Sequence, residues 1–235
     1  IQPCPPFMGA SVPVLSKAEL EGSAFTEAHL RGVRARGWRA ASSIAVEVGQ
    51  LLRSGEKFIY AYYDGVDKIA HERGFGSFYE AELASADAIV KKIQDALTPG
   101  AVLIVTADHG QVMVGTNTMP PHPEVMAMVA YQSGEGRCRW LHARDGVQVE
   151  LLARATTHHS NVAWVASKEQ VIDENWLGPR LGSATRKRLG DVVLVPREPI
   201  SFDDAADTGP FILQCRHGAL TDDELDVPLL AMAVK

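Results

Sequence analysis

The amino-acid sequence predicts an α/β fold in which helices flank a mostly parallel sheet. Two apolar runs of strand length, KFIYAYY at 57–63 and AVLIVT at 101–106, enclose a long segment with helical periodicity at 77–97. Strand, helix and strand in this order form a βαβ unit, which implies a parallel sheet with helices on its faces. Polar residues follow both runs directly, at the carboxyl ends of the strands, where sheets of this class carry their sites.

The first part of the chain gives the weaker signals. Residues 1–38 are rich in Pro, Gly and Arg, and we expect loops there with a short helical piece at 17–20. Residues 40–53 are predicted to form an amphipathic helix that Gly55 ends, because apolar side chains recur at steps of three and four. The run at 57–63 is predicted to be a buried strand, because aromatic and β-branched residues crowd it.

The central helix has both a start and a stop signal. The sequence SFYE at 77–80 has the form of a capping box, and Pro99 and Gly100 end the helix. One face of this helix is predicted to carry the apolar residues Leu83, Ala86, Val90, Ile93 and Leu97. The second strand at 101–106 follows directly.

Residues 116–200 are less regular. Runs at 125–132 and 137–144 are predicted to pair as a hairpin around SGEG, followed by a helix at 147–155 and a strand at 191–198. Residues 211–235 are predicted to form a strand, a turn, an acidic connection and an apolar strand. We expect a single partial domain over 1–235, in which residues 1–115 and 201–235 form an α/β core and residues 116–200 form an excursion packed on it.

Composition excludes several classes of partner. The chain has 235 residues and a formal net charge of −6, which argues against binding to a nucleic-acid polymer. The three cysteines are scattered and form no C-x-x-C pair, so neither a disulfide framework nor a zinc knuckle is indicated, and we expect a reducing, cytoplasmic compartment. No apolar run approaches the roughly 18 residues of a membrane span, and no membrane partner is expected.

The chain opens with IQPCPPF, without an initiating Met or a signal-peptide pattern. This start is typical of the middle of a protein. We therefore expect the chain to be the C-terminal part of a longer one, with a missing N-terminal segment as a partner.

Five groups at the predicted strand ends indicate chemistry. They are Asp67 and His71, Asp108 and His109, and His217. Asp67 stands four residues before His71, so both fall on one face if the segment is helical. Each group taken alone could be a solvated turn, but together they would concentrate carboxylates and imidazoles at one edge of a sheet. Mixed carboxylate and imidazole ligands suit Zn²⁺, and Mn²⁺ or iron less well, whereas Ca²⁺ and Mg²⁺ prefer oxygen ligands.

The same residues carry a resemblance. DKIAHERG at 67–74, TADHGQ at 106–111 and RHGALTDDELDVPLL at 216–230 resemble the metal-binding motifs of the alkaline phosphatase superfamily. Among its members the type I phosphodiesterase/nucleotide pyrophosphatase family is the nearest in order and spacing, over 58–110 and again over 211–235. RLGDVVLV at 188–195 is also similar to bacterial relatives. The resemblance implies an alkaline-phosphatase-like fold and a phosphoric ester hydrolase that acts on phosphodiesters or nucleotide pyrophosphates.

The resemblance also implies roles. Asp67, His71 and His217 match the three protein ligands of one metal ion, and Asp108 and His109 match two ligands of a second ion. In the family a first-strand Asp and a Thr or Ser nucleophile complete the second site, and the nucleophile forms a covalent phosphoryl or nucleotidyl intermediate. This chain departs from the pattern, because Ser11 and Thr26 lie outside any such context. No catalytic nucleophile is therefore assigned, and the chain alone is expected to be inactive.

Two alternatives stay open. The same ligands serve a phosphonate hydrolase or phosphomutase of the superfamily, and a non-catalytic metal-binding module would retain them without turnover. Other candidates are set aside: Asp64 lacks the helical spacing to His71 that favours Asp67. His122 could face a substrate cleft, but we expect it to be a proline-bounded loop histidine, and the pair His158 and His159 is expected in a solvated polar loop.

Overall fold

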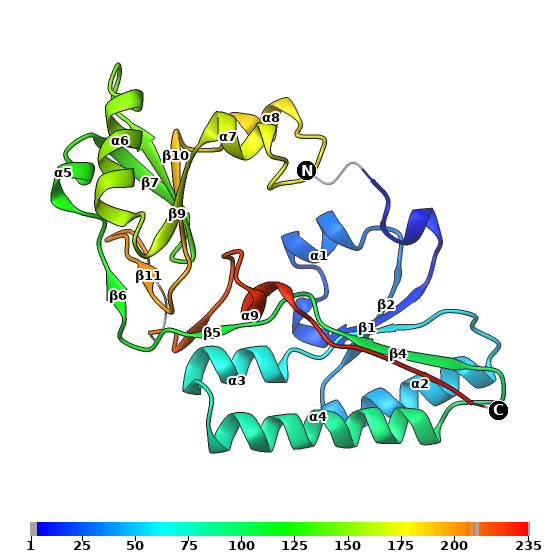
Figure 1. Ribbon diagram of the computed structural model, residues 1–235. Helices are drawn as coiled ribbons and strands as arrows, with labels where there is room; N and C mark the ends of the chain where they lie inside the picture. The colour runs from blue at the N-terminus through cyan, green and yellow to red at the C-terminus, as the bar shows by residue number, and fades with distance from the viewer. Residues whose placement is uncertain (1–3, 208, 210–211, 235) are drawn as a thin grey trace. The chain divides into compact units, whose positions relative to one another are not determined.

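The structure is a computed structural model that describes residues 4–207, 209 and 212–234. The chain divides into two compact units (Figure 1). Unit 1 comprises the chain up to Ile69, Gly76–Thr106 and the residues from Pro228 on, and unit 2 comprises Ala70–Phe75 and Ala107–Val227. This division does not test the single partial domain predicted for residues 1–235 with an excursion at 116–200, which stays a prediction.

Unit 1 is built on a three-stranded parallel sheet in the order β2-β1-β3. Its elements are η1 (Pro6–Gly9), β1 (Pro13–Lys17), η2 (Ala18–Leu20), α1 (Ala24–His29), β2 (Arg34–Trp38), η3 (Ala41–Ser43), α2 (Ile44–Arg53), β3 (Tyr60–Ala61), the start of α3 (Gly65–Arg73), α4 (Ser77–Asp95), β4 (Val102–Thr106) and β13 (Leu229–Ala233). Strand β4 pairs antiparallel with β13, from Thr106 opposite Leu229 to Val102 opposite Ala233. Helices α2 and α4 run alongside each other in this unit (Figure 1).

The core of unit 1 joins the helices to the sheet. Its buried members are Leu15, Trp38, Ile44, Ala45, Val48, Leu51 and Ile93. The predicted helix at 40–53 is confirmed as η3 and α2, and its apolar stripe faces β1. On α4, the face predicted to be apolar is buried only toward its end, because Ile93 is buried whereas Leu83 is exposed.

Three local predictions for unit 1 are wrong. Residues 13–17 and 34–38 form strands instead of loops, and β2 has the polar sequence RARGW because it is an exposed sheet neighbour of β1. The run at 57–63 is not a buried strand, since only Tyr60–Ala61 pairs and both residues are exposed. The capping box at 77–80 does not form: Ser77 is already helical, and Gly76 stands at the N-cap without a side-chain bond.

The strand-helix-strand prediction also needs correction in its pairing. In the described part of the chain β3 pairs with β1, while β4 pairs with β13. The two apolar runs therefore belong to different ladders, and parallel pairing is found in the β2-β1-β3 sheet and between β6 and β11.

Unit 2 is built on a four-stranded antiparallel sheet in the order β7-β8-β10-β9. After the end of α3 its elements are β5 (Val112–Met113), β6 (Thr118–Met119), α5 (Pro123–Met126), β7 (Val129–Glu135), β8 (Cys138–Ala143), α6 (Gln148–His159), β9 (Ala163–Ser167), α7 (Lys168–Asp173), α8 (Ser183–Arg186), β10 (Val192–Pro196), β11 (Ser201–Phe202), β12 (Cys215–Arg216) and α9 (Asp222–Leu225). The predicted hairpin, helix and strand within 125–198 are confirmed as β7–β8, α6 and β10. Phe211, where the last predicted strand begins, lies outside the described residues.

The sheet of unit 2 is buried on both faces. Alternate residues of a strand point to opposite faces, so Val192 and Leu194 pack with α6 while Val193 and Val195 pack on the other side. The second face also takes Trp140 and Ala219. Ala219 follows His217 by two residues, so this packing fixes the segment after β12.

Two arginines are buried in unit 2 and fully partnered. The Arg137 guanidinium donates to both carboxylate oxygens of Glu224, over 3.0 and 2.6 Å, and to the carbonyls of Glu198 and Ile200. Arg139 donates to the Phe202 carbonyl over 2.9 Å and pairs with Asp207. Buried charges require such partners because transfer from water costs several kcal/mol per ion.

The Glu224 carboxylate holds the segment that follows His217 through hydrogen bonds to two of its residues. It accepts hydrogen bonds from the Ala219 N–H over 3.0 Å and from Thr221 Oγ1 over 2.5 Å, besides those from Arg137. Burial by itself would raise the pKa of Glu224, but these hydrogen bonds outweigh it and hold the pKa below the ordinary value of 4.5.

None of the helices in the described part of the chain is long and apolar enough to cross a membrane.

We predict that the ion pair of Arg137 and Glu224 dominates the acid stability of unit 2. Because the pKa of Glu224 is lowered by folding, its contribution is complete above pH 4.5 and is lost as the pH falls through the folded-state value. Glu224→Gln leaves a buried cation without its counter-ion and should cost about 3–5 kcal/mol at neutral pH. Urea unfolding between pH 3 and 7 measures both effects.

The double variant Arg137→Met, Glu224→Leu removes both charges and should recover part of this loss. Glu56→Gln is the matched control, because Glu56 forms its ion pair with Arg34 at the surface and should change the unfolding free energy little. Equal losses in Glu224→Gln and Glu56→Gln would contradict the prediction.

Candidate functional site

Asp67 and His71 lie one turn apart on helix α3, which passes from unit 1 into unit 2. Their relative position is set by the helix itself, since side chains four residues apart lie on the same face. Asp64, the alternative considered above, is engaged elsewhere: its carboxylate accepts from Lys17 Nζ over 2.8 Å.

The imidazole of His71 is oriented by the strand that precedes His217. His71 Nδ1 lies 2.7 Å from the carbonyl oxygen of Cys215, and the Gln214 N–H donates to the His71 carbonyl over 2.7 Å. A carbonyl can only accept, so Nδ1 carries the proton, and in the neutral ring Nε2 is the nitrogen that could bind a metal. This is the arrangement that metal-binding histidines commonly adopt.

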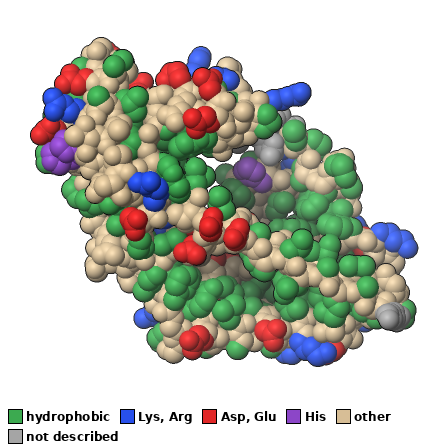
Figure 2. Space-filling model, in the orientation of Figure 1, with side chains coloured by type: hydrophobic (Ala, Val, Ile, Leu, Met, Phe, Trp, Pro, Cys, Tyr) green, Lys and Arg blue, Asp and Glu red, His purple; other side chains and the backbone are tan. Residues whose placement is uncertain are grey.

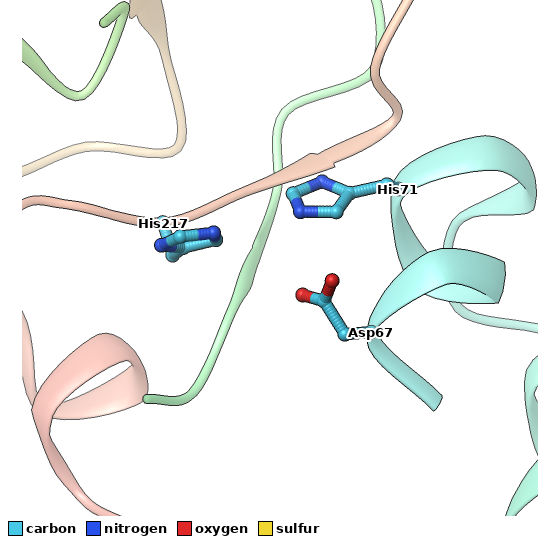
Figure 3. A group of neighbouring side chains, drawn as sticks. All are labelled: Asp67, His71 and His217. Atoms are coloured by element: carbon cyan, nitrogen blue, oxygen red, sulfur yellow. The ribbon is translucent and has the colours of Figure 1, made fainter. Parts of the chain in front are cut away.

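His217 completes a group of three side chains, which we call the Asp67 group (Asp67, His71 and His217). Each of the three offers a ligand atom, and these atoms all lie within 4.8 Å of one another. Figure 3 shows the two rings and the carboxylate around a common space. The rings of His71 and His217 have centroids 5.3 Å apart.

His109 joins this group through His217. The two rings are stacked, with centroids 3.5 Å apart and planes 14° apart. His109 Nδ1 lies 3.0 Å from the Gly110 carbonyl, and its Nε2 lies 3.7 Å from Asp108 Oδ1. The Asp108 side chain is 73% exposed. The structure thus brings Asp67, His71, His109 and His217 together, with Asp108 beside His109 at the surface.

A close backbone contact holds the loop of His109 against the helix that follows His217. The Gly110 N–H donates to the Glu224 carbonyl over 2.8 Å. A Cβ at position 110 would lie 2.1 Å from the Asp223 carbonyl oxygen, closer than any real contact. Glycine is required here because the two backbones touch.

The donor set fits a divalent transition metal. Two imidazoles and one carboxylate are typical Zn²⁺ ligands, and the hydrogen bond to the Cys215 carbonyl orients the His71 ring. The role of these residues as metal ligands stays a prediction.

Sequence reasoning missed the residues that hold the site in place. Arg137 and Glu224 are 87 positions apart and gave no pairing signal. A partial signal exists in TDDE at 221–224, since a Thr three residues before a Glu is typical of a helix start, and α9 begins there.

One prediction about the remaining histidines is wrong, and one is confirmed. His158 and His159 belong to the last turn of α6 rather than to a solvated loop, and His159 is 2% exposed. His122 lies between Pro121 and Pro123, just before α5, as predicted, and there it is half-buried and stacks on His158.

Comparisons with known proteins place the chain in one family. The sequence profile of the type I phosphodiesterase / nucleotide pyrophosphatase family matches residues 34–219. The fold is similar to human ectonucleotide pyrophosphatase / phosphodiesterase 5, with a TM-score of 0.64, 15% identity, and coverage of 95% of this chain and 60% of that one. It is also similar to phosphonoacetate hydrolase from Sinorhizobium meliloti 1021 in complex with phosphonoformate, with a TM-score of 0.67, 17% identity, and coverage of 97% and 66%. No curated protein sequence matches significantly.

The fold and the match together define a member of the alkaline phosphatase superfamily, which confirms the expected fold class. Within it, the chain belongs to the type I phosphodiesterase / nucleotide pyrophosphatase family, a family of hydrolases. The chain spans 60% to 66% of the length of the two solved structures described above.

We predict that Gly110→Ala displaces the loop that carries Asp108 and His109. The added methyl group overlaps the Asp223 carbonyl, and relieving such overlap typically costs about 1–3 kcal/mol. Thermal unfolding measures the loss, and the His109 ring signals in an NMR spectrum should shift. Gly182→Ala is the control, because nothing lies within 4 Å of a Cβ at that position. An unchanged melting temperature in Gly110→Ala would contradict the prediction.

Proposed function

We propose that this chain is the C-terminal part of a phosphoric ester hydrolase that cleaves phosphodiesters or nucleotide pyrophosphates with the help of two divalent metal ions, Zn²⁺ being the best match and Mn²⁺ the second. The observation that carries the proposal is the Asp67 group, in which ligand atoms from α3 and from the segment after β12 lie within 4.8 Å of one another. Family membership supplies the reaction class.

Each residue has a proposed role. Asp67, His71 and His217 hold one ion, while Asp108 and His109 contribute two ligands to the other. When bound, the ions supply Lewis-acid polarisation of the phosphoryl oxygens and lower the pKa of an attacking hydroxyl group. The chain's own contribution is orientation: the Cys215 carbonyl fixes the His71 ring, and Glu224 with Arg137 fixes the segment that carries His217.

The nucleophile is proposed to be a Thr or Ser outside this chain. A structural neighbour supports a threonine: the murine ectonucleotide pyrophosphatase / phosphodiesterase 5 in complex with AMP is an inactive variant in which a Thr is replaced by Ala. The match to that structure has a TM-score of 0.64 and 13% identity, and it covers 95% of this chain and 60% of the murine chain.

Exposed apolar side chains in unit 1 support a further segment. Val102 and Ile104 of β4 and Leu229 of β13 lie on one face of the β4–β13 ladder and are all at least 60% exposed. Hydrophobic side chains cover much of the face around β4 (Figure 2). Contiguous apolar surface of this kind marks a place where other chain packs, and we propose that the missing N-terminal segment packs there.

A second candidate function has one observation in its favour. Phosphonoacetate hydrolase, also solved in complex with phosphonoacetate, is among the similar structures, with a TM-score of 0.68 and 17% identity. A phosphonate hydrolase or phosphomutase would use the same ligands. Product analysis on nucleotides, phosphonates and sugar phosphates separates these reactions, and turnover of none by the full-length protein would favour a non-catalytic metal-binding module.

We predict that Asp67→Ala removes a zinc equivalent from the folded chain, whereas Asp64→Ala does not. Both variants remove one carboxylate from neighbouring positions, but Asp64 pairs with Lys17. Loss of a direct ligand should weaken binding by at least the roughly 10–100-fold that loss of an outer-shell partner costs. Titration calorimetry with Zn²⁺ measures the change, and equal zinc content in both variants would argue against the assignment.

We further predict that the isolated 235-residue chain hydrolyses a nitrophenyl phosphodiester with Zn²⁺ no faster than a sample without protein, because no nucleophile is assigned to it. The protein encoded by the complete reading frame should turn it over, and replacement of its Thr or Ser nucleophile should abolish that turnover. Robust turnover by the isolated chain would overturn the division of roles.

A further inference from the structure

A second cluster of possible metal ligands lies in unit 2, between α5 and the end of α6. His122, Glu124 and His158, which we call the His122 cluster, each offer a ligand atom, and these atoms lie within 4.8 Å of one another. His158 Nε2 lies 3.4 Å from Glu124 Oε2. The cluster shares no residue with the Asp67 group.

The two imidazoles are stacked face to face, with centroids 3.6 Å apart and planes 8° apart. Aromatic rings prefer offset or edge-to-face contacts to such a sandwich, and two protonated rings would repel each other strongly at this distance. Joint coordination of one cation would turn the rings out of this stack, because the lone pair of each ring nitrogen lies in its ring plane and two parallel planes do not meet at a shared ion. Zn–N bonds of about 2.0–2.1 Å at tetrahedral angles place ligand atoms about 3.3 Å apart. The ligand atoms of the cluster already lie within 4.8 Å of one another, so ring rotation would have to bring them to this spacing.

The backbone that carries the cluster is anchored in the core. The His122 N–H donates to Nε2 of His159 over 3.1 Å, and the His159 ring is buried with its edge against Phe202. Val125, one turn along α5, is fully buried. His158 and His159 are neighbours on α6. The buried His159 therefore anchors the backbone of His122, while His158 places its ring against the His122 ring at the surface. Ligands on such supported elements keep their geometry.

A cavity adjoins the two histidines. It has a volume of about 340 Å³ and is lined by His122, His158, His159 and mostly apolar neighbours, among them Met119 and Val162. Three protein ligands beside an accessible hollow match a site with an open coordination position, in contrast to the closed four-ligand sites that only stabilise structure.

We propose that His122, Glu124 and His158 bind a divalent transition-metal ion, Zn²⁺ being the best match, with a fourth position that opens to the adjoining cavity for water or a small ligand. Imidazole and carboxylate donors favour Zn²⁺ over Mg²⁺ and Ca²⁺, which prefer oxygen ligands. This site is independent of the proposed hydrolase function.

Two contacts compete with the ion. Arg154 donates to Glu124 Oε2 over 3.1 Å, and the Glu124 N–H donates to His122 Nδ1 over 3.3 Å, which is long for a hydrogen bond. Arg154 and Glu124 are both about half exposed, so the guanidinium can move away. Removal of this competing cation, in Arg154→Met, should therefore tighten metal binding.

The test is a zinc titration of the full chain in a His217→Ala background, which disables the Asp67 group, followed by calorimetry and by metal analysis after gel filtration. The expected result is one remaining zinc equivalent, which His122→Gln with His158→Gln removes. Glu124→Gln changes an exposed side chain and should weaken binding at least 10-fold by loss of a ligand, compared with about 10–100-fold for an outer-shell partner. Arg154→Met should strengthen binding several-fold.

His142→Gln is the matched control, because His142 also stacks on an aromatic ring, that of Tyr131, and should leave the zinc content unchanged. Replacement of Zn²⁺ by Co²⁺ gives an independent readout, since tetrahedral coordination by the His122 cluster would produce intense visible absorption. The proposal is overturned if the His217→Ala chain binds no zinc, or if its zinc content is the same with and without Glu124 and the two histidines. Failure of the hydrolase assay alone leaves these outcomes unaffected.

Discussion

The geometry of the candidate site depends on one buried ion pair. Arg137, at the turn between β7 and β8, is fully buried and binds both oxygens of Glu224 on α9. Glu224 in turn binds the Ala219 N–H, so the segment between His217 and α9 is closed on itself. The Glu224 carbonyl then receives Gly110, which brings the loop of His109 to the same place. A single guanidinium is thereby linked to two histidine-bearing loops that are more than 100 residues apart in the chain.

Burying an ion pair costs desolvation free energy. Its advantage over apolar packing at this loop is that its geometry is directional. Hydrophobic contact is not directional, whereas a bidentate pair of guanidinium and carboxylate has a fixed geometry. The segment after β12 is short, and within it Ala219 and Leu220 pack into the core. Apolar packing alone would leave the orientation of His217 loosely defined, so the charged pair provides the precision that ligand positions need.

What the sequence revealed was local. Helix α2, helix α6, the β7–β8 hairpin and strand β10 have clear periodicity. His109 and His217 follow strands β4 and β12 as predicted, whereas Asp67 lies in the first turn of helix α3 instead of at a strand end. The sequence did not reveal which strands pair or which distant side chains meet. The sequence of β2 is typical of a loop because most of its residues face solvent beside β1. The run at 57–63 is typical of a core strand, although only two of its residues pair. The Arg137–Glu224 contact and the burial of His159 arise from long-range packing, which single-sequence periodicity does not encode.

Strand β10 has a consequence for how unit 2 comes apart. It is hydrogen-bonded to β8 on one edge and to β9 on the other, and Val192, Val193, Leu194 and Val195 are all buried. Its amide protons are therefore shielded from solvent on every side, and they exchange only when the sheet as a whole opens. We therefore expect β8, β9 and β10 to hold the slowest-exchanging amides of the unit, and the loops at the edge of the sheet to open without them.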